Sequence, residues 1–450
     1  MREPEARTAS FLALLRHGGT PFQAAEPPQL AGLRADRESL RGCFDPAAEP
    51  PPWWDAACEG LHLAGAQLGA ANLVEADLTG ANLSRANLAG VLARSARFEV
   101  ARIEETDFTG GDLSGAHFAG VAGGQAVFAD AMLEDARFTG AALRFATLRR
   151  ALLDGADFTR ADLWGADFTD ADADDTHFRQ ARLDEAVLVN VNLTGADFEG
   201  ASLKKARLTG SRLRGANLSG AKLDGADLSG ADLSDTQLVR LNLTTCSLRH
   251  ARFANAWLDG TRLRIGQLGG AVGEEAAGDY AGAVASYLAL ERNMRSIGDR
   301  AGASWAFKRA RRMGRHHAGQ RALAAWRARD WRAGLRDGYG WAADRFVEWL
   351  CDYGESLSRI VRAFALAILL FALLYGLTGG LIPEGRDGSP TYNPLDLVSY
   401  SALNMMTANQ PELGIKPVGR LTNALVGTQG ALGIILMGLF GYVLGNRFQR

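Results

Sequence analysis

The chain has 450 residues, enough for two or three domains, and its formal net charge is only −2. Such a charge excludes a bulk attraction to nucleic acid. Its four cysteines lie far apart, without the paired spacing of a zinc site or a disulfide framework, so reduced thiols in a cytosolic setting are expected. These are Cys43, Cys58, Cys246 and Cys351. The N-terminal apolar run 11–15 is too short for a secretory signal, so any membrane insertion uses an internal segment.

Residues 1–60 are predicted to form an N-terminal cap for the repeat that follows. They contain a short apolar helix candidate and a proline-rich stretch that ends in Trp53-Trp54. Such a cap is needed because the open end of a stacked β structure exposes unpaired backbone groups, which invite edge-to-edge association.

A five-residue repeat dominates residues 61–270. From Leu63 to Leu268, 39 of the 42 positions spaced five apart are Leu, Phe or Ile, and only Ala93, Gly123 and Ala173 differ. A small residue, usually Ala, lies two positions earlier, and a polar residue lies between the two. A period of five matches neither a helix nor a flat strand, but it fits a solenoid with one repeat per side. The large residue and the Ala are then expected to point inward.

This pattern resembles the pentapeptide-repeat family, as in Ala71-Asn72-Leu73 and Ala156-Asp157-Phe158. The resemblance covers about 210 residues. It implies a right-handed quadrilateral β-helix with four repeats per coil, and residues after 270 would close its far end.

Some members of that family resemble DNA in shape and charge and bind topoisomerases. Residues 61–270 contain 27 Asp and Glu against 22 Lys and Arg, a net of −5, which is weak for such mimicry. A structural or interaction scaffold is the favoured interpretation, and DNA mimicry stays the alternative. The four histidines of the repeat are isolated and are expected to face solvent; they are His62, His117, His177 and His250.

Residues 271–355 are predicted to form a helical linker. One helix is expected from Glu274 to Ile297 and another from Ala301, after a break at Gly298-Asp299. A helical hairpin that caps the β-helix is favoured over a single tetratricopeptide-like unit. His316-His317 has no third ligand candidate nearby, so no metal site is predicted.

The stretch 300–362 is basic, with 14 Lys and Arg against 6 Asp and Glu, and four tryptophans are interleaved with the charges. They are Trp326, Trp331, Trp341 and Trp349. Basic and aromatic residues together can indicate nucleic-acid binding. Because this stretch leads directly into an apolar span, an amphipathic helix on the cytoplasmic membrane surface is favoured instead.

Residues 356–450 are predicted to be a membrane domain. No charge occurs in 363–383 or in 421–446, and each stretch is long enough to cross a bilayer. Arginines precede the first span and follow the second, so both termini are predicted to be cytoplasmic in the inner (plasma) membrane. The flanking arginines are Arg359, Arg362, Arg447 and Arg450.

The connector between the spans holds a short apolar helix candidate. Asn393-Pro394 marks its start, and Asp396 in the first turn suits the helix dipole. At about 12 residues it is too short to cross a bilayer. Irregular backbone at membrane depth is tolerated only where it lines a cavity or is buried in protein. The connecting segment 383–420 is therefore expected either to lie outside the membrane or to re-enter it.

The segment 356–450 resembles the two-transmembrane tetrameric cation channels. The resemblance implies a homotetramer, a pore helix that includes Tyr400, Leu403 and Met406, and a following filter loop. A potassium filter has the form T-x-G-Y-G-D, whose glycines let backbone carbonyls converge on the ion. The matching residues here lack those glycines, so potassium selectivity is not expected. They are Thr407, Ala408, Asn409, Gln410, Pro411 and Glu412.

A wider pore lined by Asn409 and Gln410, with a ring of Glu412 that favours cations, is the hypothesis. The inner helix is rich in glycine, and these glycines are predicted to serve close packing or a gating hinge. They include Gly433, Gly438, Gly441 and Gly445.

Two functions therefore remain open: an ion channel with a cytoplasmic β-helix scaffold or sensor, and a non-conducting membrane-anchored interaction scaffold. No arrangement of catalytic residues is visible, so neither an enzyme nor a cofactor is expected. The predicted partners are the lipid bilayer, permeant ions and further copies of the chain, but not nucleic acid.

Overall fold

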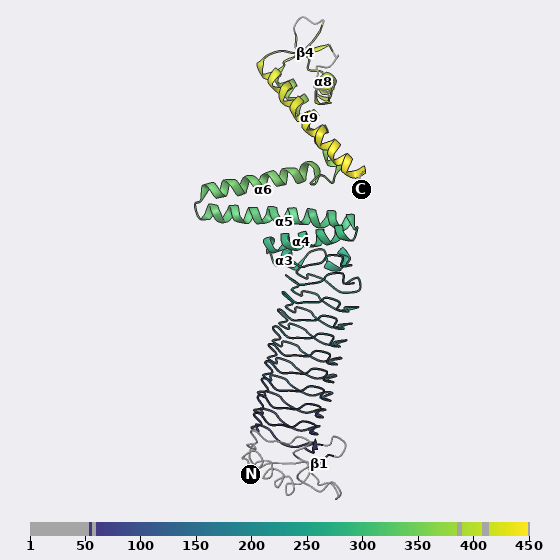
Figure 1. Cartoon of the computed structure of the whole chain (residues 1–450). Coiled ribbons are helices and arrows are strands. Elements are labelled where there is room, and N and C mark those ends of the chain that lie inside the picture. Colours follow the sequence, from purple (N-terminus) through teal and green to yellow (C-terminus); the bar gives the residue numbers. More distant parts are fainter. Residues whose placement is uncertain (1–53, 56–59, 385–388, 407–413, 449–450) are drawn as a thin grey trace. The chain divides into compact units, whose positions relative to one another are not determined.

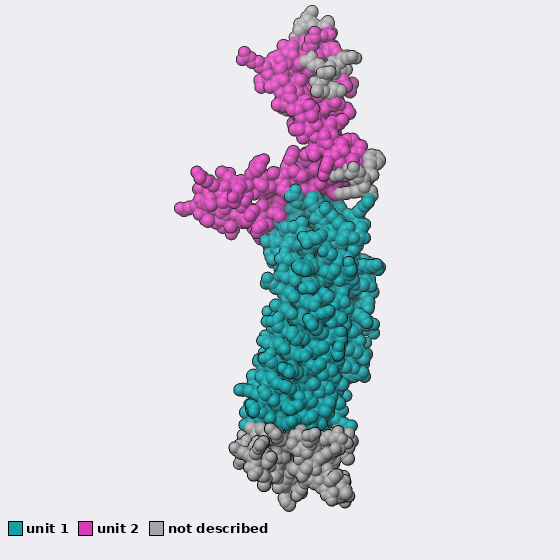
Figure 2. All heavy atoms as spheres, in the orientation of Figure 1, with its two compact units in different colours: residues 1–313 teal, residues 314–450 magenta. Residues whose placement is uncertain are grey.

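The computed structural model describes residues 54–55, 60–384, 389–406 and 414–448. The chain divides into two compact units, residues 1–313 and 314–450, coloured teal and magenta in Figure 2. Almost all of the predicted N-terminal cap lies outside the described residues. Of that segment the structure describes strand β1 (Trp54–Asp55), which pairs antiparallel with β2 (Gly60–Leu61).

The repeat of the first unit forms a coil whose successive turns are joined by parallel bridges between residues twenty apart (Figure 1). Asn87, for example, pairs with Asp107. The Leu88 amide then donates to the Asp107 carbonyl at 2.7 Å. Twenty residues per turn means that four repeats of five residues make the four sides of each coil. The β-helix predicted from the repeat is confirmed.

The corners of the coil are β-turns whose third residue has a left-handed backbone conformation. Leu63, for example, accepts a hydrogen bond from the Ala66 amide at 3.0 Å, and Gly65 between them has φ 69°. Such a turn favours glycine, because a side chain at positive φ is strained. Many corners nevertheless carry other residues, including the β-branched Val100 at φ 52°. The fold therefore imposes a backbone cost at these corners.

Replacing Val100 by glycine is expected to raise the free energy of unfolding of the coil by about 1 kcal/mol. A left-handed conformation costs a residue with a side chain about 1–2 kcal/mol, and the added freedom of glycine in the unfolded chain offsets part of that gain. Thermal unfolding of the full chain, followed by circular dichroism, would measure the change. The control is Val74→Gly, one residue before a left-handed corner, which should destabilise. A loss of stability in Val100→Gly would contradict the strain assigned to this corner.

The coil interior is filled by the large residue and the preceding small residue of each repeat, and almost all of them are fully buried. Phenylalanines twenty residues apart stack face to face: Phe138 lies 4.8 Å from Phe118 and 4.7 Å from Phe158. Phe128, which lies on the opposite side of the coil, meets Phe138 edge to face at 5.7 Å. The predicted inward positions thus form continuous ladders of rings and aliphatic side chains.

Several inward small positions carry a polar atom, and each such atom finds a backbone acceptor. Thr106 and Thr236 donate to the carbonyls of residues 23 positions earlier, at 2.7 and 2.9 Å. The Cys246 thiol donates to the Leu223 carbonyl at 3.0 Å, and burial raises its pKa to about 11. This cysteine therefore has the character of a buried core residue rather than a reactive thiol.

Helices cover the C-terminal end of the coil. These are η1 (Ile265–Leu268), α3 (Gly273–Ala276), α4 (Tyr280–Ser296) and the first part of α5 (Arg300–Arg327). Asn293 of α4 accepts from the Thr261 amide at 3.1 Å and donates to the Thr261 carbonyl at 2.9 Å. Ser286 accepts from the Phe253 amide at 3.0 Å. Side chains of the cap thus satisfy backbone groups that would be unpaired in an open coil.

The single helix predicted from Glu274 to Ile297 is wrong, because the chain breaks into α3 and α4. The break lies at Gly278, which has φ 75°, and Asp279 then caps α4 by accepting from the Gly282 amide at 3.0 Å. Glycine is favoured just after the end of a helix, and aspartate is favoured as the N-cap of the next one, so the Gly-Asp pair ends one helix and starts another.

The second unit begins within α5 and continues with α6 (Trp331–Cys351). Residues 300–351 of the basic stretch therefore form two helices, α5 and α6, rather than one amphipathic helix, because Arg329 is left-handed and Asp330 caps α6. The two helices are tied together by a buried ion pair between Arg315 and Glu348. Each of the four tryptophans of this stretch keeps 43–64% of its surface exposed on the described chain. They are Trp326, Trp331, Trp341 and Trp349.

The remaining helices are α7 (Leu357–Thr378), α8 (Pro394–Met406) and α9 (Arg420–Phe448). Strands β3 (Leu381–Pro383) and β4 (Ile415–Pro417) pair antiparallel. α7 and α9 are both long and apolar enough to cross a membrane. α8 packs against both of them, and the three helices share one apolar core.

Candidate functional site

The candidate site is the short helix α8 and its contacts with the two apolar helices. Its start agrees with the sequence signals: the Asn393 side chain accepts from the Leu395 amide at 3.2 Å, next to Pro394 as first helical residue. Asp396 in the first turn accepts from the Thr391 hydroxyl at 2.8 Å. The helix has 13 residues, about 20 Å at 1.5 Å per residue, so it covers only part of a bilayer's thickness.

The three residues predicted for the pore helix lie on different sides of α8. Tyr400 is fully buried and meets Tyr375 of α7 edge to face at 5.4 Å. Leu403 and Met406 keep 38% and 63% of their surface exposed. Tyr400 therefore anchors the helix to α7, whereas Met406 faces away from the described part of the chain.

A buried polar cluster, missed by the sequence reasoning, joins the three helices. It consists of Tyr375, Ser401, Asn404 and Gln429. Gln429 accepts from the Tyr375 hydroxyl at 2.6 Å and from the Asn404 amide at 3.0 Å. Its own amide donates to the Ser401 hydroxyl at 2.6 Å, and Ser401 donates to the Ile368 carbonyl at 2.8 Å. The available signal was a glutamine inside an otherwise apolar span, because buried polar residues there must find partners.

Gly433 marks the point where α8 meets α9. A Cβ atom added at Gly433 would collide with the backbone carbonyl of Met405, near the end of α8. Of the two predicted roles for this residue, the contact supports close packing. Gly433 also lies near the middle of the apolar stretch 420–445.

The other three predicted glycines of α9 differ from Gly433. A Cβ atom added at Gly438, Gly441 or Gly445 would meet nothing within 4 Å of the described chain. Sequence alone treats the four glycines alike, and the structure separates them into one that contacts α8 and three on an open face of α9.

The predicted filter lies outside the described residues. This applies to Thr407, Ala408, Asn409, Gln410, Pro411 and Glu412. The chain is described up to Met406 and again from Gly414, just before β4. On that side of the helices, Lys416 of β4 pairs with Glu384 at 2.6 Å.

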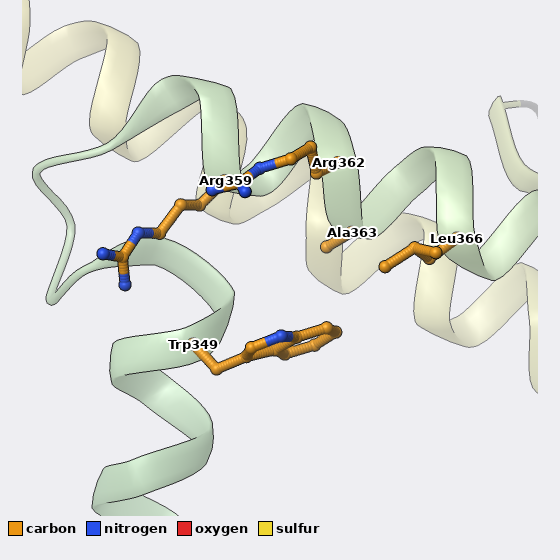
Figure 3. A pocket seen from close by; sticks show the side chains of 5 residues that line it. All are labelled: Trp349, Arg359, Arg362, Ala363 and Leu366. Atoms are coloured by element: carbon orange, nitrogen blue, oxygen red, sulfur yellow. The ribbon is translucent and has the colours of Figure 1, made fainter.

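A groove of about 240 Å³ lies at the opposite end of α7, where the chain arrives from α6 (Figure 3). We call it the arginine groove; it is lined by Trp349, Arg359, Arg362, Ala363 and Leu366. Figure 3 shows both arginine side chains extending from α7 back towards the turn after α6, with the indole beneath Ala363 and Leu366. The described residues contain no group of His, Cys, Asp or Glu arranged to hold a metal ion.

Comparison with known protein families finds the family described as Pentapeptide repeats, matched in eight copies. The matches together cover residues 62–172 and 174–264. This agrees with the observed coil, so the chain is a pentapeptide-repeat protein with two apolar helices in its C-terminal unit. No curated protein matches the sequence.

Solved structures that are similar to this chain include pentapeptide-repeat proteins. HetL, described as involved in heterocyst differentiation regulation in the cyanobacterium Nostoc sp. strain PCC 7120, is 32% identical, with 44% of this chain and 90% of HetL covered and a TM-score of 0.32. QnrB1, described as a plasmid-mediated fluoroquinolone resistance protein, is 26% identical over 41% of this chain and 91% of its own, with a TM-score of 0.21. With such TM-scores, the fold assignment rests on the repeat and its coil alone.

Proposed function

We propose that this protein is a membrane ion channel of the two-transmembrane tetrameric type. It conducts cations without potassium selectivity, and its coil serves as a cytoplasmic scaffold or sensor. The observation that carries the proposal is the contact of Met405 with Gly433, because a helix too short to cross a bilayer ends beside the middle of the second apolar helix.

This contact supports a re-entrant path for the chain. α8 begins near the end of α7, where Leu397 approaches Gly376, and its other end belongs to an apolar cluster that includes Ile368 of α7 and Leu436 of α9. If α7 and α9 cross the membrane, α8 ends at Met406 within the thickness of the bilayer. A chain that enters and leaves a membrane on the same side must be buried in protein or line a water-filled cavity, and a pore supplies such a cavity.

The buried polar cluster supports a defined position for α8. A helix held only by apolar contacts in lipid has little preference for depth or rotation, since lipid tails are as apolar as its partners. Ser401 forms a hydrogen bond to α7 and Asn404 forms one to α9. These two hydrogen bonds fix the depth and the rotation of α8. A fixed position is what a helix needs when the loop after it has to meet the corresponding loops of three other subunits.

The arginines that flank the two spans support cytoplasmic placement of both termini in the inner (plasma) membrane. The coil would then lie in the cytoplasm. Its acidic residues are partly neutralised, as in the pairs Asp130–Arg150 at 2.7 Å and Asp162–Arg144 at 2.6 Å. Alternating, paired charges favour a scaffold or sensor over a mimic of DNA.

Replacing Glu412 by glutamine is expected to lower the preference for cations over anions, because a ring of four carboxylates at the pore mouth concentrates cations. The measurement is the reversal potential in planar bilayers under a salt gradient, with the full chain purified and reconstituted. The shift should be towards the anion equilibrium potential, with currents still present.

The matched control is Glu384→Gln, which removes one carboxylate from the β3–β4 ribbon, where Glu384 is paired with Lys416. Its reversal potential should stay close to that of the unmodified protein. Equal shifts in both variants would assign the effect to general surface charge and remove Glu412 from the filter.

A further inference from the structure

We infer that the arginine groove binds the headgroup of an anionic phospholipid. This inference rests on the proposed membrane crossing of α7, but not on ion conduction. The groove lies where the charged residues of α7 end and its uncharged stretch begins, between Arg362 and Ala363. If α7 crosses the bilayer, this is the depth of the phosphate groups.

The two arginines differ in what holds them. Arg359 donates to the backbone carbonyl of Glu348 at 2.6 Å and lies 3.7 Å from a carboxylate oxygen of Asp352. Its guanidinium is therefore fixed against the end of α6. Arg362 is exposed and forms no ion pair with a described residue. Arg359 is thus held in place, and Arg362 has hydrogen-bond donors available for a ligand. This pair suits a phosphate group, because guanidinium groups donate several hydrogen bonds in a fixed geometry.

The groove is amphipathic along its length. Its charged end is formed by the arginines and its apolar end by Ala363 and Leu366, with the indole of Trp349 beneath the apolar end (Figure 3). Trp349 keeps 54% of its surface exposed. Tryptophan is enriched at the membrane interface, where its ring lies at headgroup level. Inorganic phosphate would use only the charged end.

An exposed leucine stripe continues from the apolar end of the groove along α7. Its members keep 53–75% of their surface exposed, and they are Leu366, Leu369, Leu370, Leu373 and Leu377. The groove itself, at about 240 Å³, is smaller than typical sites for whole drug-sized ligands of about 300–1,000 Å³. It therefore fits a headgroup, with the acyl chains lying along the stripe outside it.

The test is calorimetric titration of the full chain in detergent with dioctanoyl phosphatidylglycerol, dioctanoyl phosphatidylcholine and inorganic phosphate. We expect one phosphatidylglycerol per chain, bound about tenfold more tightly than phosphatidylcholine, and no measurable binding of inorganic phosphate. Arg362→Gln should weaken phosphatidylglycerol binding about tenfold. Trp349→Ala should weaken both lipids.

Matched controls are Arg332→Gln and Trp331→Ala, which make the same changes on α6 outside the groove and should leave the affinity unchanged. Melting temperatures of all variants show whether the fold survives. Equal binding of the two lipids, tight binding of inorganic phosphate, or equal effects of Arg362→Gln and Arg332→Gln would each overturn the inference. The titration measures lipid binding and requires no ion current. A chain that binds no phosphatidylglycerol and a chain that conducts no ions are therefore distinguishable results.

Discussion

Replacing Phe138 by alanine is expected to lower the free energy of unfolding of the coil by about 3–5 kcal/mol. The ring is fully buried between Phe118 and Phe158 in one ladder and meets Phe128 from the other side. Its loss removes apolar contacts on three sides and leaves a cavity. The cavity cannot close, because the hydrogen bonds between turns fix the spacing of the ladder.

Denaturant unfolding of the full chain, followed by circular dichroism, would measure this effect. The control is Phe145→Ala, which removes a ring of which 50% is already exposed at a corner of the coil. Its main ring contact is with Trp164, at 4.6 Å, so a change below about 1 kcal/mol is expected. Similar effects of the two substitutions would contradict a core built from stacked ladders.

Replacing Gly433 by alanine is expected to lower the stability of the second unit by about 1–3 kcal/mol or more and to abolish ion flux. The added methyl group collides with backbone, the Met405 carbonyl, so no side-chain rotation relieves the clash. Either α8 moves away from α9 or α9 bends. Both changes displace the loop that follows Met406.

The control is Gly438→Ala, in the same helix, where an added Cβ meets nothing within 4 Å of the described chain. Alanine is the better helix former by about 1 kcal/mol, so the melting temperature in detergent should stay the same or rise. A thermal shift assay on both variants, together with vesicle flux, makes the comparison. Equal melting temperatures would show that Gly433 has no special contact with α8.

Much of the coil could be predicted because its repeat is both local and periodic. Each five-residue unit repeats the inward position, as at Phe118 and Phe138, so the period indicates which side chains fill the interior. The four sides of each turn were implied by the resemblance to the pentapeptide-repeat family, because a period of five does not determine how many repeats make one turn. Even the exceptions fit, since Gly123 leaves a space that Ile103 and Leu143 approach from the turns on either side. One local break was overlooked: Gly278 and Asp279, a helix stop signal followed by a helix start signal, separate α3 from α4.

The candidate site was less predictable because its contacts join residues far apart in the sequence. Asn393 and Pro394 correctly indicated the start of α8, since capping is local. The pairing of Tyr375 with Gln429 joins residues 54 positions apart, and no local pattern indicates it. The distinction between Gly433 and Gly438 likewise depends on where the end of α8 lies.

Ion flux through vesicles tests the central proposal most directly. The full chain, purified in detergent and reconstituted, should carry monovalent cations in preference to chloride and should show little preference for potassium over sodium. Empty vesicles and the Gly433→Ala variant are the comparisons. Flux in the unmodified protein that the variant lacks is the predicted result. No flux of any ion across a range of voltages, lipid compositions and membrane tensions would contradict the channel and leave a membrane-anchored scaffold.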